Sequence, residues 1–158
     1  MEEVDAYRQG LLSALEGVVN ELSETVAAIP SSKWHLTFGL DSHTPHYTLA
    51  HLRELEAQVF TIQLRRILDE DIPMLPVFDG EAWMERHYKP EEPVLCIVQD
   101  FTTLRKQELN WLGDLPPADW SCTARHPSRG MHTLQWWVEL QLDYSYQHLS
   151  ELSSLLDT

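Results

Sequence analysis

The sequence has few cysteines, few basic residues and no long apolar run. Its 158 residues include two cysteines, Cys96 and Cys122, and neither belongs to a Cys-x-x-Cys pair, so we expect two unpaired thiols. Lysine and arginine number 11 against 25 aspartates and glutamates, and the formal net charge of −14 disfavours nucleic acid and anionic membranes as partners. No segment approaches the roughly 20 apolar residues that span a bilayer, and the first residues lack the basic and apolar parts of a leader peptide. These absences predict a soluble, cytoplasmic protein that binds neither nucleic acid nor a membrane.

Motifs of several common enzyme classes are also missing. The chain has no Gly-x-Ser-x-Gly nucleophile elbow, no glycine-rich phosphate loop and no His-Glu-x-x-His pair. Internal repeats and a strand-like alternation of apolar and polar residues are absent as well. The sequence therefore favours neither a β-fold nor the enzyme classes that those motifs mark.

Proline divides the chain into four segments, because it lacks an N–H group and clashes with the preceding turn of a helix. In each segment apolar residues recur every three or four positions, which predicts helices over about residues 4–29, 45–69, 92–112 and 133–156. With 43% hydrophobic residues, these helices can form one domain over residues 1–158. The expected fold class is all-α, an antiparallel four-helix bundle with a long crossover between the second and third helices.

Residue types at the expected helix ends support these limits. Thr44 suits the N-cap of the second helix, and Pro45 suits its first position. Gly113 stands where the C-terminal cap of the third helix belongs. The proline-rich crossover contains one more pattern, from Asp79 to Tyr88, which predicts a short helix capped by the Asp79 carboxylate.

The last predicted helix carries a polar stripe on its apolar face. Gln141, Tyr144 and His148 follow one another at spacings of three and four, so their polar tips point toward the core. A buried hydroxyl or imidazole without a partner costs roughly 1–3 kcal/mol, so the stripe needs mutual hydrogen bonds or a ligand. His51, in an apolar run of the second helix, is a candidate partner.

Short motifs spread over nearly the whole chain carry a resemblance to a known family. They are Thr44-Pro45, Ala50-His51-Leu52, Glu56, the connection 73–88, Phe101, Leu104-Arg105, Asp119-Trp120, His126-Pro127 through Gly130 to Thr133-Leu134, and Gln147-His148-Leu149. In these motifs the sequence resembles the DinB-like (DinB/YfiT-like) superfamily of four-helix bundles. The resemblance implies a metal-dependent enzyme that holds nickel or zinc with three histidines, one on the second helix and two, four residues apart, on the fourth. It also implies a homodimer.

The ligand set implied by the resemblance is incomplete in this sequence. Its first and last positions fall on His51 and His148, and its middle position falls on Tyr144, a reluctant ligand because the pKa of a phenol is near 10. One interpretation is a metal held by these three residues, with water or Glu54 completing the shell. A second is a metal-free polar pocket that includes Gln141 and binds a small molecule. In the third, the groups only satisfy one another.

Two functions therefore remain open. The leading interpretation is a metal-dependent hydrolase or thiol S-transferase acting on a small molecule, as the resemblance implies. The alternative is a metal-free, non-catalytic bundle that binds a small ligand or serves as a dimeric interaction module. Retention of His51 and His148 favours the first, and Tyr144 favours the second.

Several other residues receive structural interpretations. Trp136 and Trp137 are about 100° apart around the helix, so Trp137 can line the core and the pocket while Trp136 faces an interface. Arg105, if buried, needs a carboxylate such as Glu56. His43 and His46 flank the cap of the second helix, where they are either solvated or close to a site at one end of the bundle. His126 and His132 are expected in loop packing.

Overall fold

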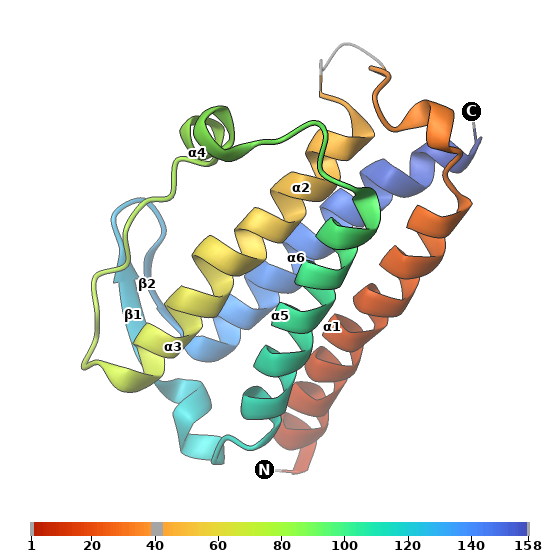
Figure 1. Cartoon of the computed structure of the whole chain (residues 1–158). Helices are drawn as coiled ribbons and strands as arrows, with labels where there is room; N and C mark the ends of the chain where they lie inside the picture. Colours follow the sequence, from red (N-terminus) through yellow and green to blue (C-terminus); the bar gives the residue numbers. More distant parts are fainter. Residues whose placement is uncertain (1, 39–42, 158) are drawn as a thin grey trace.

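Four long helices lie side by side in the computed structural model, which describes residues 2–38 and 43–157 (Figure 1). They are α1 (Glu2–Ala28), α2 (Pro45–Leu55) with its continuation α3 (Thr61–Asp69), α5 (Val94–Gly113) and α6 (Leu134–Ser153). A π-helical turn, Glu56–Phe60, joins α2 to α3, so the predicted second helix is one rod with a local bulge. The predicted all-α four-helix bundle is confirmed. Within the described residues, none of the helices has both the length and the apolar character of a membrane span.

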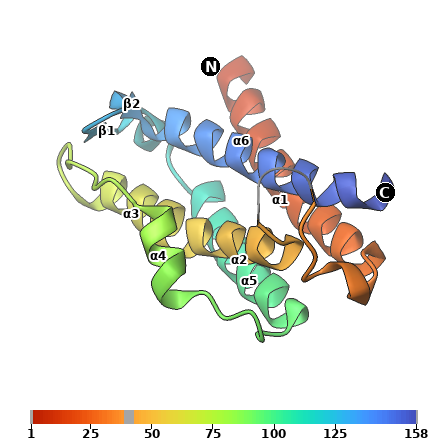
Figure 2. The same ribbon diagram turned by 90° about the horizontal axis from the view of Figure 1, so that it is seen from above.

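The long crossover sets the order and direction of the helices. Helix α1 packs against α5 and α6, and α2 packs against the same two helices. The segment between α3 and α5 carries the chain back along the bundle and includes α4 (Gly80–His87). As a result α5 runs in the same direction as α2 and α3, while α1 and α6 run the opposite way (Figures 1 and 2). Each long helix is therefore antiparallel to one of its two neighbours.

Most predicted helix ends are found in the structure. Thr44 caps α2 by accepting a hydrogen bond from the Tyr47 amide at 3.1 Å, and Asp79 caps α4 by accepting one from Ala82 at 3.1 Å. Gly113 was expected as a cap beyond the third helix. It is instead the last residue of α5, and Asp114 is the cap with an ordinary φ of −94°.

A short hairpin, which the sequence did not indicate, precedes α6. Strand β1 (Thr123–His126) pairs antiparallel with β2 (Gly130–Thr133), and His126 lies opposite Gly130 in the register. Each strand has four residues, too few for an alternating pattern to stand out. Gly130 has a φ of 81°, which favours glycine, and it closes the turn. The hairpin lies beside α3 and the start of α6 (Figure 1).

A buried polar layer divides the apolar core into two clusters. One cluster contains Phe101 and the other Leu112 of the same helix, and Arg105 and Glu108 lie between them on α5. Glu56, Gln141 and Ser145 complete the layer, and all five polar side chains are at most 1% exposed: Glu56, Arg105, Glu108, Gln141 and Ser145. The layer fixes the register of the helices, because each member must reach its partners without water.

Arg105 binds three neighbouring helices at once. Its guanidinium donates to both carboxylate oxygens of Glu56, at 2.8 and 3.2 Å, which confirms the predicted pair. It also donates to the Leu15 carbonyl at 3.1 Å and to the Ser145 hydroxyl at 2.8 Å. Burial opposes ionisation of Glu56, but the charge and hydrogen bonds of Arg105 outweigh it and lower the pKa of Glu56.

Glu108 is the member of the layer that we expect to be protonated. Burial and the adjacent Glu56 carboxylate raise its pKa well above the usual 4.5. The folded state therefore retains a proton that the unfolded chain releases above pH 4.5. Stability should then fall as the pH rises from 4.5 toward the raised pKa of Glu108. Glu56 titrates below this pH range, because its pKa is lowered.

Glu108→Gln should remove much of this pH dependence, since glutamine is neutral at every pH and has the same size. We expect the free energy of unfolding of the variant to decline less than that of wild type between about pH 5 and pH 8. Urea unfolding at a series of pH values measures the slope. Glu16→Gln, an exposed change on α1, is the matched control. A wild-type slope in Glu108→Gln would show that another group carries the dependence.

Candidate functional site

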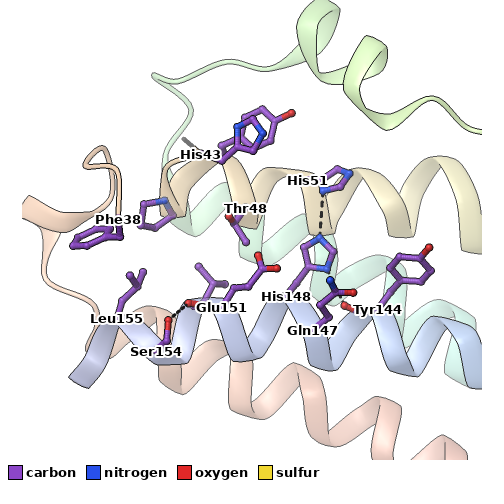
Figure 3. A pocket seen from close by; sticks show the side chains of 13 residues that line it. Phe38, His43, Thr48, His51, Tyr144, Gln147, His148, Glu151, Ser154 and Leu155 are labelled. Carbon is purple, nitrogen blue, oxygen red and sulfur yellow. Dashed lines mark hydrogen bonds between the residues drawn. The ribbon is translucent and has the colours of Figure 1, made fainter. Parts of the chain in front are cut away.

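Two pockets adjoin between α2 and α6, and they share His51 and Tyr144 as wall residues. The larger, of about 730 Å³, lies toward the end of α6 and is lined by Phe38, His43, Thr48, His148, Glu151 and Leu155 among others (Figure 3). The second, of about 360 Å³, lies under the crossover and the hairpin. A group at His51 or Tyr144 can therefore act on a ligand in either pocket.

The two histidines of the predicted ligand set meet where the pockets join. Figure 3 shows His148 of α6 pointing across to His51 of α2, and the His148 Nε2 lies 3.2 Å from the His51 Nδ1. The His148 Nδ1 lies 2.8 Å from the Tyr144 carbonyl oxygen, which can only accept, so this nitrogen carries a hydrogen. In a neutral pair His148 Nε2 then accepts from His51 Nδ1, and His51 Nε2 keeps a free lone pair.

The environment of His51 favours the neutral form of its imidazole. Burial, together with the nearby His148 and His43, lowers the pKa of His51 to about 4. His51 is therefore uncharged at neutral pH. A metal ligand must be uncharged imidazole, whereas an efficient general base needs a pKa nearer to 7. The pair suits ligation better than proton transfer.

The two imidazoles are suitable ligands for a divalent metal, but a catalytic site normally has a third protein ligand. Two imidazole nitrogens that bind one tetrahedral metal lie about 3.4 Å apart, close to the 3.2 Å between His51 Nδ1 and His148 Nε2. Both nitrogens can bind a metal once the hydrogen on His51 Nδ1 moves to His51 Nε2. Catalytic zinc sites have three protein ligands, and within residues 2–38 and 43–157 no group of three His, Cys, Asp or Glu side chains is placed to hold a metal. The hydroxyl of Tyr144 accepts a hydrogen bond from Arg129 Nη2 at 2.7 Å. Tyr144 as the third ligand remains a prediction.

Comparison with known proteins identifies the family. The profile of the DinB superfamily matches residues 14–152. The chain belongs to the DinB superfamily. It is 22% identical over 144 residues to a protein of Oceanobacillus iheyensis named as a candidate metal-dependent hydrolase, with 91% of this chain and 83% of that protein covered. The solved structure of YfiT from Bacillus subtilis, described as a probable metal-dependent hydrolase with an unusual four-helix bundle topology, matches with a TM-score of 0.85 at 19% identity. That match covers 94% of this chain and 85% of YfiT.

Only one of the three further pocket residues predicted for this DinB-superfamily chain lines a pocket. Trp137, 2% exposed, forms part of the wall of the second pocket. Gln141 belongs to the buried polar layer, where its Nε2 donates to Glu56 at 3.0 Å, so it lines neither pocket. Glu54 accepts from Arg53 Nε at 3.1 Å and from Trp83 Nε1 at 2.9 Å, and these bonds hold it outside both pockets.

Of the two histidines beside the cap of α2, His43 reaches the site, and His46 is neither solvated nor in the larger pocket. His46 is 1% exposed, and its ring nitrogens lie 2.8 Å from the Tyr88 hydroxyl and 2.7 Å from the Glu92 carbonyl. These two contacts connect the end of the crossover to α2. His43 lines the larger pocket and stacks on Tyr47 at 4.0 Å between ring centroids. His126 and His132 pack in the hairpin before α6, as expected. His126 accepts hydrogen bonds in the turn and also lines the second pocket, and His132 stacks on Trp136.

The sequence did not indicate the part that the crossover plays at this site. Phe78 and Gly80 line the second pocket, and a Cβ atom on Gly80 would lie 3.0 Å from His51 Nε2. The only signal in the sequence was the position of Gly80 directly after the Asp79 cap. Gly80 lets the crossover approach His51 Nε2, the ring nitrogen that does not face His148.

Gly80→Ala should disturb His51 and weaken metal binding about tenfold, the lower end of the effect of changing a residue that supports a ligand. The added methyl forces the imidazole to move by tenths of an ångström, because 3.0 Å is tighter than ordinary contact. Calorimetric titration with nickel measures the change. Gly10→Ala on α1, where a Cβ meets nothing within 4 Å, is the control. Equal affinity in the two variants would show that the crossover does not position His51.

Proposed function

We propose that this protein is a metal-dependent enzyme of the DinB superfamily that hydrolyses a small molecule or transfers a thiol to it, with His51 and His148 as protein ligands of the metal. The observation that carries the proposal is the convergence of His51 Nδ1 and His148 Nε2 at 3.2 Å where two pockets meet. The names of the two relatives support metal-dependent hydrolysis. Transfer of a thiol to the small molecule is the finer alternative for the same centre.

Each residue of the centre has a separate task in this proposal. The Tyr144 carbonyl fixes the orientation of His148, and burial keeps His51 neutral and able to bind a metal. A bound divalent metal supplies a Lewis acid and lowers the pKa of water or of a thiol. The two pockets hold the substrate beside the centre and limit the access of bulk water.

Elemental analysis of protein purified without a histidine tag tests the proposal. We expect close to one nickel or zinc per chain after dialysis, with loss of that metal in His51→Ala. Catalytically silent, metal-free protein that also fails to bind nickel or zinc on titration would contradict it. The same preparation gives the activity test with ester, amide and thiol-acceptor substrates.

A metal-free ligand-binding protein is the second candidate function, and one observation favours it. The Tyr144 hydroxyl, at the third ligand position of the family, accepts from Arg129 Nη2 at 2.7 Å. In that case His51 and His148 serve only as a hydrogen-bonded pair in the pocket wall. Absence of metal binding together with saturable binding of a small molecule would establish this function.

We also propose that the protein forms a homodimer. Trp136 is half-buried and stacks on His132 at 3.5 Å, while Trp137 enters the core, so the two indoles face different surroundings as the sequence predicts. Half-exposed indole is typical of interfaces. Light scattering should give about twice the mass of one chain at micromolar concentrations. A mass near 18.3 kDa over that range would exclude a dimer.

A further inference from the structure

We propose that Arg129 and Tyr144 form an anion subsite in the second pocket, which binds the carboxylate of a small organic molecule with an apolar body. The inference rests on the proposed function, because it names the substrate class of that same site. Three features carry it: a hairpin turn that places Arg129, a hydroxyl whose hydrogen is left to donate, and an apolar wall behind them.

The turn between β1 and β2 fixes the backbone of Arg129. His126 Nδ1 accepts hydrogen bonds from the amides of Ser128 and Arg129, each at 3.2 Å. His132 Nε2 donates to the Arg129 carbonyl at 2.7 Å, and Gly130 supplies the positive φ of 81°. These bonds hold both peptide groups of an exposed arginine, so little backbone order has to be gained when a ligand binds.

The donors of the subsite are brought together by one hydrogen bond. Arg129 Nη2 donates to the Tyr144 hydroxyl oxygen at 2.7 Å, so the hydroxyl hydrogen of Tyr144 is free to point toward another acceptor. Within the described residues, the salt bridges include none that pairs Arg129 with a carboxylate. The remaining guanidinium N–H groups and the Tyr144 O–H are a suitable donor set for a carboxylate.

The rest of the pocket favours a ligand with an apolar body. Its volume is about 360 Å³, and its wall is largely aliphatic and aromatic: Leu55, Val59, Phe60, Val77, Phe78 and Trp137. Glu81 of α4, an exposed residue, also lines this pocket and repels an anion. The carboxylate must therefore bind at the hairpin, near Arg129. The body of the ligand then extends toward His51, which lines the same pocket.

This geometry gives the tyrosine at position 144 a function of its own. Tyr144 lines both pockets, and its hydroxyl accepts a hydrogen bond from Arg129 of the hairpin turn. Histidine at this position is shorter and has no hydroxyl to pair with Arg129. The exchange of a third imidazole for a phenol thus adds a contact for the substrate beside the His51–His148 pair.

Binding of matched probes to chelator-treated wild-type protein tests the subsite. The probes are 4-phenylbutyrate and hexanoate, each compared with its neutral amide, and the readouts are calorimetry and tryptophan fluorescence. We expect wild type to bind each carboxylate about tenfold or more tightly than its amide, as a charge-assisted pair should. Arg129→Met should abolish this preference, and Tyr144→Phe should reduce it. Arg125→Met, an exposed change on β1 outside the pocket, should keep it.

Three results would overturn the inference. They are equal affinity of wild type for carboxylate and amide, no binding of either carboxylate up to about 10 mM, and retention of the preference in Arg129→Met. Nickel titration of the same samples separates this inference from the proposed function. Nickel binding without carboxylate preference removes the subsite alone, and carboxylate preference without nickel binding removes the metal enzyme alone.

Discussion

Tyr144→His is expected to bind nickel or zinc about 100-fold more tightly than wild type, because a third imidazole then joins the two that already converge. Positions 144 and 148 are one helical turn apart on α6, and their side chains lie above one another. Figure 3 shows Tyr144 and His148 projecting from α6 on the side that faces α2 and His51. Calorimetric titration of the two proteins measures the difference in affinity.

Tyr144→Phe is the matched control for this gain. It removes the hydroxyl and its bond to Arg129 but adds no donor, so its metal affinity should stay near that of wild type. A folded Tyr144→His protein with wild-type affinity would show that position 144 does not converge on the pair. The ligand set implied by the family resemblance would then be wrong for this protein.

Arg105→Met should be among the most destabilising single changes in the protein, at about 3–5 kcal/mol of unfolding free energy. Methionine fills most of the volume but leaves Glu56 as a buried carboxylate without its cation, and it also removes a donor to the Leu15 carbonyl. Chemical denaturation measures the loss. Arg66→Met on α3, which breaks a surface pair with Glu70, should have a much smaller effect.

A double variant distinguishes the buried charge from simple loss of packing. Arg105→Met combined with Glu56→Leu removes the stranded carboxylate, so it should recover part of the stability lost in Arg105→Met. If Glu56→Leu lowers the stability of the Arg105→Met protein further, by as much as an ordinary core substitution does, then the unpaired Glu56 charge is not the cause of the loss. Both proteins must be compared at the same pH, because Glu108 titrates beside them.

The parts of the structure that depend on local sequence could be predicted. Thr44 and Asp79 are caps whose side chains bind backbone amides three residues later, and the helical spacing of apolar residues gave the four long helices. Arg105 could be paired with Glu56, because a buried arginine needs a carboxylate. His51 and His148 could be placed together through the family resemblance.

What could not be predicted depends on contacts between distant segments. Glu108 reads as an ordinary polar residue of an amphipathic helix, but the meeting of four helices buries it beside Glu56. The hydroxyl of Tyr144 turns to Arg129 because a hairpin with two four-residue strands brings that arginine to α6. His46 is buried because the returning crossover closes over it. No periodic pattern in the sequence reports these approaches.

Nickel titration of tag-free wild type, His51→Ala and His148→Ala is the most direct test of the metal centre. We expect one metal site per chain in wild type, and we expect each alanine variant to lose this site while keeping its helical content. Wild type that binds no nickel or zinc would contradict the proposed metal centre. Binding that persists in both variants would contradict it equally, because the metal would then be held elsewhere.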